Sequence, residues 1–388
     1  MGWEELLESL DELETKDVYD GYFCSVKDAV VIIILGSLCD LQNVKKIHEW
    51  ASTEHVHAFL EKEFGIKRIP CYWWLLSLIA LVTPASLNLC MKNWVKRIAP
   101  GLVEKIEAEE EEENSKKKTQ LTVAIDGKEV RSTEKMDKYD NPLHIVSAQL
   151  GELGLTLAQV AVDGKSNEIP AVQKLIKSLE ISGCIIVADA LNCQIDTAQA
   201  VLDQHADYLL SAKDNQLSLK EDLEDYIIDE KLRSKMDTFT TKDYGHGRTE
   251  VRTAYTTDDV SWNPGGREWP GLKCIGAIHT HFETKKGSSD EWHYYISSKS
   301  LTAEELIHHA RKEWSVETMH WLLDVHFRED SCRIQSRNAK QNMNMLRKFA
   351  LNIVRIHKIA TSSKSALNGI MFQCLMNPTK LCSVLHEN

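Results

Sequence analysis

Two aspartates stand directly behind stretches that have the pattern of buried strands. Asp126 follows LTVAI (residues 121–125), in which apolar residues alternate, and Asp189 follows the apolar run CIIVA (184–188). We expect both strands to end at these residues, so that the two carboxylates converge on one crevice of a sheet. Paired carboxylates repel each other unless cations lie between them, and Mg²⁺ takes carboxylate oxygens while keeping waters for a substrate phosphate. The pair indicates metal-dependent phosphate chemistry; a turn or helix cap is the alternative role for each aspartate.

The segment EWSVETMHWLLDVHFRED (313–330) supplies a third candidate acid. Positions three, four and seven apart share one face of a helix, and here they are occupied by Glu317, His320, Trp321 and Asp324. A face that mixes acids and a histidine with an aromatic residue makes a poor stripe for a pure core. Glu317 can therefore join the two aspartates, while aromatic packing with charges at the rim is the alternative interpretation.

These acids need a scaffold, and strands alternate with helices between residues 119 and 213. The strand patterns fall at 121–126, 143–150, 156–164, 184–189 and 206–213. The first three follow one another with only turns between them, and the last two are separated by helical segments. The order predicts an α/β fold with a mixed sheet covered by helices.

The remaining segments differ in character from this alternating part. Residues 1–105 have helical spacing and predict an all-helical N-terminal domain, followed by a charged linker at 106–118 that contains EAEEEEENSKKK. Residues 214–298 predict a β-rich insertion, in which FTTKDYGHGRTEVRTAYTT and LKCIGAIHTHFETKKG each have the pattern of a hairpin. Helices resume at Thr302, where TAEE has the form of a capping box, and continue to about residue 360, before a tail at 361–388. The catalytic core would then comprise 119–213 and 299–360.

Composition excludes several classes of protein. The chain has 388 residues, 43% of them hydrophobic, which is enough for two or three soluble domains with real cores. Its ten cysteines include no CxxC pair, which argues against a disulfide framework or a zinc knuckle and favours the bacterial cytoplasm. The runs AVVIIILGSLC and CYWWLLSLIALV fall short of the roughly 20 apolar residues that span a bilayer, so they predict core helices.

The net charge of −12 is spread unevenly. Residues 1–113 carry 11 Lys and Arg against 21 Asp and Glu, whereas residues 331–388 carry nine against one. A basic segment of this kind can face phosphate or can be a solvated helix. Arg333, Arg337 and Lys340 are spaced by four and three, which predicts a single basic stripe on a helix.

Longer stretches of the sequence resemble the DDE transposases of bacterial insertion sequences in the H-repeat-associated (ISAs-type) family. The resemblance extends over about residues 20–360 and is carried by IDGKEVR, HIVSAQ, KSNEIPA, VADALNCQ, SAKDNQ, GHGRTEVR, YYISS, EWSVETMHWLLDVHFRED and RNAKQNMNMLRKFALNIVR, in that order. It implies an RNase H-like core with a β-rich insertion and an associated helical domain ahead of it. It also implies an enzyme that moves a DNA element by strand cleavage and strand transfer.

The resemblance implies a catalytic and metal-binding triad of Asp126 in IDGK, Asp189 in VADA and Glu317 in WSVE. The implied cofactor is Mg²⁺, as a pair of ions, with Mn²⁺ as a substitute. The implied partners are the terminal inverted repeats and target DNA, bound by a homodimer or higher homo-oligomer. Residues expected at the DNA are Lys165, Asn167, Lys213, Asn215, Gln216, His246, Arg248, Arg311, Trp314, His320, Arg333 and Arg337, with Glu168 lining the site and Trp321 as a second candidate for stacking on a base.

Two alternatives stay open. The spacing from Glu317 to the His320–Trp321 pair is one residue shorter than in many members of the family, which leaves Glu313 as a rival for the third acid. A nuclease of the same fold that cuts without strand transfer, or a domesticated DNA-binding protein that no longer catalyses, would share much of the sequence pattern. The presence of all three acids favours an active enzyme.

Overall fold

The computed structural model describes residues 2–15, 24–113, 120–131, 142–162, 167–245, 248–262, 264–285 and 287–386. The chain forms two compact units, each built from separate stretches of sequence. The first comprises residues 1–118, 127–166 and 318–388, and the second comprises residues 119–126 and 167–317. Only strand β1 (Thr122–Val130) and helix α11 (Ala303–Val325), among the described elements, have residues in both units.

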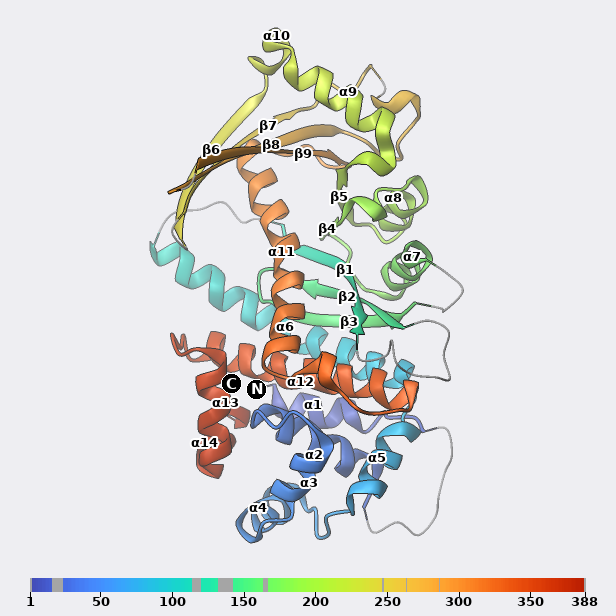
Figure 1. The fold of residues 1–388 in the computed structure, drawn as a ribbon, viewed down its shortest axis with the longest axis vertical. Helices are drawn as coiled ribbons and strands as arrows, with labels where there is room; N and C mark the ends of the chain where they lie inside the picture. The colour runs from blue at the N-terminus through green and yellow to red at the C-terminus, as the bar shows by residue number, and fades with distance from the viewer. Residues whose placement is uncertain are drawn as a thin grey trace. The chain divides into compact units, whose positions relative to one another are not determined.

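The first unit is mostly helical (Figure 1). Its helices are α1 (Trp3–Leu10), α2 (Val26–Leu38), α3 (Val44–Ala51), α4 (Glu54–Phe64), α5 (Tyr72–Leu81), α6 (Pro84–Glu113), α12 (Arg337–Ala360), α13 (Leu367–Met376) and α14 (Pro378–His386), with the short turn η5 (Glu329–Ser331). Strands β2 (Leu143–Leu150) and β3 (Leu155–Ala161) pair antiparallel, and the strand order is β3-β2-β1. The expected N-terminal helices and the helix that ends near residue 360 are therefore present.

Helix α12 is the centre of this first unit, and Figure 1 shows it between β3 and helices α2 and α5. Trp94 on α6 stacks on Phe349 on α12 with ring centroids 5.6 Å apart. The Asn342 side chain donates to the carbonyls of Ile79 and Val82 at the end of α5, at 2.8 and 2.9 Å. Because the N-terminal helices share a core with α12, the compact units do not follow the predicted domain boundaries. Within the described residues, no helix is both long and apolar enough to cross a membrane.

The second unit carries most of the sheet. Its elements are α7 (Glu168–Ser178), β4 (Ile185–Ala188), η2 (Ala190–Asn192), α8 (Ile195–Leu202), β5 (Asp207–Ala212), η3 (Asp214–Gln216), α9 (Leu217–Ile228), α10 (Glu230–Arg233), β6 (Asp237–Gly245), β7 (Arg248–Thr257), η4 (Pro264–Gly266), β8 (Cys274–Thr284) and β9 (Gly287–Ser297). The strand order is β1-β4-β5-β9-β8-β7-β6, in which β1, β4 and β5 are parallel and the others antiparallel. The mixed α/β fold predicted for an RNase H-like core is confirmed.

Strand β4 shows why the apolar run at 184–188 was informative. All four of its residues are buried, since it lies between two parallel neighbours and is covered on both faces. The β-rich stretch is also confirmed, and Figure 1 shows β6 to β9 as a curved sheet with α9 and α10 on one side of it. At Thr302 the predicted capping box is formed: Glu305 N donates to Thr302 Oγ1 at 3.2 Å, and Thr302 N donates to Glu305 Oε2 at 2.9 Å.

Several local predictions were wrong. Strand β1 does not end at Asp126 but continues to Val130, and its residues beyond Asp126 belong to the first unit, where β2 is the neighbouring strand. The stretch 272–287 is not a hairpin by itself; it forms β8, and its partner in the hairpin is β9. The C-terminal tail at 361–388, for which no structure was predicted, contains two helices, α13 and α14. Arg333 lies before α12, which begins at Arg337, and Lys340 is buried, so the predicted basic stripe does not form on one helix.

Candidate functional site

Asp126 on β1 and Asp189, the first residue after β4, follow the last residue pair of two neighbouring parallel strands. The last pair in the ladder between β1 and β4 is Ile125 with Ala188, and each aspartate is the next residue along the chain. Paired strands are about 5 Å apart, so the backbone positions that carry the two carboxylates are close to each other at this end of the ladder. Both aspartates are half-buried. The register brings the backbone positions of the two aspartates to neighbouring places; that their carboxylates share a metal stays a prediction.

Asp189 is held by Asn192, three residues further along the chain. The Asn192 side-chain amide donates to Asp189 Oδ1 at 2.7 Å and to Glu168 Oε1 at 3.0 Å, and its backbone N–H also approaches Asp189 Oδ1 at 3.3 Å. Burial raises the pKa of Asp189, and the negative charges of Glu168 and Asp126 act in the same direction, against the hydrogen bonds from Asn192. Asp189 thus caps the turn η2 and faces other acids at the same time.

The loop after Asp189 is secured by residues that follow β5. Asn215 donates its side-chain amide to the Ala190 carbonyl, and Gln216 donates to the Cys193 carbonyl at 2.9 Å. The sequence led us to expect Asn215 and Gln216 at the DNA, and in the structure their amides fix the backbone that begins at Asp189. Lys213 is exposed and comes directly after β5, the next parallel strand.

Helix α11 adds two further acids, one turn apart. Glu313 is partly buried, and burial raises its pKa from an ordinary value of 4.5 to about 7, with the negative charges of Asp189, Glu317 and Asp126 adding to the effect and Lys213 opposing it. Glu317 is exposed. The charges of both aspartates raise the pKa of Glu313, so Glu313 is close enough to Asp126 and Asp189 for their charges to affect its ionisation.

The position of α11 beside β1 is fixed by a buried hydrogen bond that the sequence did not reveal. Thr122 Oγ1 on β1 lies 2.8 Å from His309 Nδ1 on α11, and neither residue has any exposed surface. Thr122 and Asp126 are four positions apart and so point to the same face of β1. A threonine in a strand and a histidine in a helix are common, and nothing in the sequence marks them as a pair.

The donor set fits a hard divalent cation. The acids of β1, β4 and α11 present only carboxylate oxygens, which suit Mg²⁺ or Mn²⁺ and not the softer metals. Burial is the main cause of the raised pKa values of Asp189 and Glu313, and the charges of neighbouring acids add to it. In the part of the chain that the structure describes, no three acidic, histidine or cysteine side chains already converge as a complete metal cluster. Asp126 and Asp189, with one acid from α11, are the residues that would hold the ion.

Several predicted DNA-binding residues belong to an ion-paired cluster on the antiparallel sheet. Arg311 on α11 pairs with Asp243 on β6 at 3.1 Å, and Arg252 on β7 pairs with the same carboxylate at 2.6 Å. The Arg252 guanidinium also lies 5.1 Å from the ring centre of Trp314, whose side chain is 45% exposed. Arg248 is paired with Glu250. The arginine charges here are largely compensated, by Glu250 on the same strand β7 and by Asp243 on β6, and the sequence could not show the second of these partners.

The other predicted site residues are distributed as follows. Lys165 and His246 lie outside the described residues. Asn167 is the N-cap residue of α7 in the second unit, whereas His320, Arg333 and Arg337 belong to the first. Trp321 on α11 is 56% exposed and lies edge-on to the ring of His326 at 5.9 Å.

Comparisons with known proteins show the family of this chain. The family described as "Transposase DDE domain" matches residues 117–353, a range that includes every candidate acid. The protein YbfL of Escherichia coli K12 is 30% identical over 370 residues, which cover 92% of this chain and 91% of YbfL. YhhI of the same strain, an H repeat-associated protein provisionally named a transposase, is 29% identical over 93% of this chain and 92% of its own length.

Two further similarities are more limited. YncI of Escherichia coli O157:H7, also provisionally named a transposase, is 36% identical over 60% of this chain and 61% of its own length. A cryo-EM structure of the piggyBac transposase synaptic complex with hairpin DNA aligns with 99% of this chain and 77% of its own, at 11% identity and a TM-score of 0.43, which is too low to establish a shared fold. On the family match and the near full-length relatives, the chain belongs to the H repeat-associated family of DDE transposases.

Proposed function

We propose that this protein binds the ends of a DNA element and catalyses metal-dependent cleavage and transfer of DNA strands, with Asp126, Asp189 and Glu317 as the metal-binding acids. The observation that supports the proposal is the register of β1 and β4, since Asp126 and Asp189 are the residues that follow the paired Ile125 and Ala188 along the chain. Membership in the transposase family supports the choice of DNA as substrate.

A divalent cation bound by these acids would polarise the scissile phosphate and lower the pKa of an attacking water or 3′-hydroxyl. The protein's own contribution is orientation. Asn192 holds one oxygen of Asp189, and the amides of Asn215 and Gln216 hold the loop behind it. Glu313, with a pKa of about 7, retains a proton in much of the metal-free protein at neutral pH and so limits the repulsion among the acids.

A cleavage and joining assay tests the proposal. The substrate is a labelled duplex that carries the terminal inverted repeat found next to the gene, and the reaction is run with Mg²⁺, with Mn²⁺ and with chelator. The proposal expects nicks at the element end and joined products with a second duplex, both abolished by chelator. Cleavage without joined products would support a nuclease in place of a transposase, and DNA binding with no cleavage under any of these conditions would contradict the enzyme assignment.

Lys213 gives a separate prediction for DNA contact. It is exposed, follows β5 directly and acts on the charge of Glu313, so in the proposed complex it meets a phosphate near the acids. Replacing Lys213 with glutamine should lower the slope of log binding constant against log salt by roughly 0.9, the value for one lost phosphate contact. The control is Lys177→Gln, an exposed lysine at the far end of α7 from Glu168. Equal slopes for the two variants and the wild type would remove Lys213 from the DNA interface.

A further inference from the structure

A histidine outside the set expected at the DNA lies near the acids of the second unit. His293 on β9 has 25% of its side chain exposed, and its Nε2 lies 3.2 Å from Oε1 of Glu291, which is 55% exposed. Residues two apart on a strand share a face, so the ring and the carboxylate are on the same side of the sheet. Because Nε2 donates to Glu291, Nδ1 is the ring nitrogen left for a ligand.

The register between β5 and β9 makes His293 a neighbour of Lys213. The last pair in this antiparallel ladder is Ala212 with Tyr294. Lys213 is the residue after Ala212, and His293 is the residue before Tyr294, so both stand one step beyond the last pair. Neighbouring strands are about 5 Å apart, which brings the backbones of Lys213 and His293 to about that separation.

The register between β4 and β5 relates this pair to Asp189. The last pair of that parallel ladder is Ala188 with Leu210, so Lys213 lies two residues further along the strand direction than Asp189 and on the same face of the sheet. Two strand spacings and two residues separate Asp189 from His293, which amounts to about 12 Å between their backbones. Lys213, on the strand between them, links the acids to His293.

This face of the sheet is the one that α11 covers. Tyr295, two residues after His293, packs into one hydrophobic core with Ala310 of α11. Burial raises the pKa of Tyr295 well above its ordinary value, and the charges of Glu313 and Glu291 add to the effect. His293 therefore lies on the same side of the sheet as Glu313, within the second unit.

The surroundings of His293 favour the neutral ring in the DNA-free protein. Burial and the charge of Lys213 lower the pKa of His293 below its ordinary value of 6.5, against the charge and hydrogen bond of Glu291. Lys213 also acts on Glu313 of α11, and the residue of β8 opposite the ring is the uncharged Ile278. An anion that approached Nδ1 would reverse this balance, because it would favour the doubly protonated ring.

We propose that His293 contacts a backbone phosphate of the DNA end beside Lys213 and takes up a proton from solvent as it does so. In the complex the imidazolium donates from Nδ1 to a phosphate oxygen and from Nε2 to Glu291. The inference rests on the proposed function, since it presupposes that a DNA end lies at the acids. The ligand is the phosphate backbone, so the contact carries no sequence preference of its own.

The test measures the affinity of the full-length protein for the end-repeat duplex at pH 6 and pH 8, at fixed salt and with chelator, by fluorescence anisotropy. Uptake of a proton on binding makes the complex tighter at low pH. The ratio of affinities at pH 6 and pH 8 should be about tenfold larger for the wild type than for His293→Gln, which cannot take up the proton. Glu313, with a pKa of about 7, titrates in both proteins, so its effect cancels in this comparison.

His279→Gln is the matched control. His279 lies on β8 of the same hairpin, its Nε2 is 2.9 Å from Asp290, and 28% of its side chain is exposed. Its partner across the ladder is Trp292, the residue before His293, so His279 lies on the opposite face of the sheet. The control should keep the pH dependence of the wild type.

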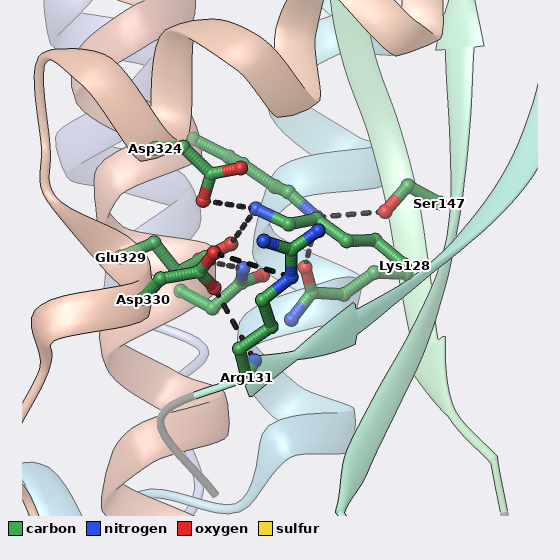
Figure 2. Close-up of polar contacts among 9 residues, drawn as sticks. Lys128, Arg131, Ser147, Asp324, Glu329 and Asp330 are labelled. Carbon is green, nitrogen blue, oxygen red and sulfur yellow. Dashed lines mark hydrogen bonds and ion pairs between the residues drawn. The ribbon is translucent and has the colours of Figure 1, made fainter.

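Asp324→Asn controls for loss of stability. Figure 2 shows Asp324 and Glu329 around the ammonium of Lys128, in a polar network of the first unit. The substitution weakens this network, so the melting temperature should fall while the pH dependence of DNA affinity stays that of the wild type. If Asp324→Asn lost the pH dependence to the same extent as His293→Gln, the loss would follow stability and the contact would be wrong.

The outcomes separate this inference from the proposed function. Equal pH dependence in the wild type and His293→Gln, with both proteins bound to the duplex, would refute the phosphate contact and leave the proposed function standing. An equal loss in His293→Gln and His279→Gln would refute the contact as well. A wild-type protein that does not bind the end-repeat duplex at either pH would refute the proposed function, and the contact with it.

Discussion

Replacing Asp189 with asparagine is expected to lower the rate of metal-dependent DNA cleavage by about a thousandfold. A bound cation contributes several kcal/mol to the transition state in phosphate chemistry, and each 1.36 kcal/mol changes a rate about tenfold. The substitution removes a charge but little volume, and the side-chain oxygen of asparagine can still accept the hydrogen bond that Asn192 donates at 2.7 Å. The fold and the DNA affinity should therefore survive. Asp126→Asn should have the same effect.

The measurement is single-turnover cleavage of the end-repeat duplex in Mg²⁺ and in Mn²⁺, with DNA affinity measured in parallel. Asp196→Asn is the control, because Asp196 is an exposed acid in the first turn of α8, a few residues beyond the η2 turn. It should cleave at the wild-type rate. Near wild-type cleavage by Asp189→Asn, or cleavage that ignores chelator, would show that the aspartate pair is not the metal site.

Glu313→Gln is expected to stabilise the metal-free protein at alkaline pH. The pKa of Glu313 is raised from 4.5 to about 7, so between these values the folded protein binds a proton that the unfolded chain releases. The free energy of unfolding of the wild type must then fall as pH rises from about 4.5 to 7. Glutamine does not ionise and escapes this loss. The gain should be small at pH 5 and reach about 3 kcal/mol above pH 7, from about 2.5 pKa units at 1.36 kcal/mol each.

Chemical denaturation in the presence of chelator, at pH 5 and pH 8, measures this gain. Glu317→Gln is the control, since Glu317 is exposed on the same helix and its neutral variant should change stability little at either pH. A gain for Glu313→Gln that is the same at both values of pH would mean that burial of a carboxyl group, and not its charge among the other acids, is what the substitution relieves.

The same two variants decide which residue of α11 is the third acid. If Glu317 is the ligand, as the family resemblance implies, Glu317→Gln loses metal-dependent cleavage and Glu313→Gln keeps most of it. The opposite pattern would assign the role to Glu313, whose side chain the structure places under the influence of both aspartates. Glu313 is also the rival that the short spacing from Glu317 to His320 and Trp321 suggests.

The sequence was most informative where burial leaves a periodic pattern. The run before Asp189 is apolar throughout because β4 is buried on both faces, and the residue pattern alone puts Asp189 directly after that strand. The alternation before Asp126 located a buried strand correctly but not its end, since β1 continues to Val130. The capping box at Thr302 was similarly readable, because both of its hydrogen bonds are made within four residues.

The sequence was least informative where partners come from distant segments. Nothing local shows that Thr122 meets His309, that Lys128 meets Glu329, or that Arg252 and Arg311 share Asp243. The predicted basic stripe of Arg333, Arg337 and Lys340 was wrong because the local spacing suggested a helix that does not extend over all three residues. Helical spacing of Arg333 and Lys340 is real in the sequence, but α12 begins only at Arg337 and turns Lys340 into the core. Helical periodicity places residues on one face only where a helix actually forms.

The most direct measurement of the metal site is anomalous diffraction from Mn²⁺ in crystals of the protein bound to its DNA end. We predict an ion held by Asp126 and Asp189 at about 2.1 Å, with a carboxylate of α11 completing the protein ligands and any second ion about 3.5 to 4 Å away. The contradicting result is an ordered DNA end with no ion at the two aspartates, and with Mn²⁺ instead at a site such as His279 and His281, whose ring nitrogens both lie 2.9 Å from Asp290.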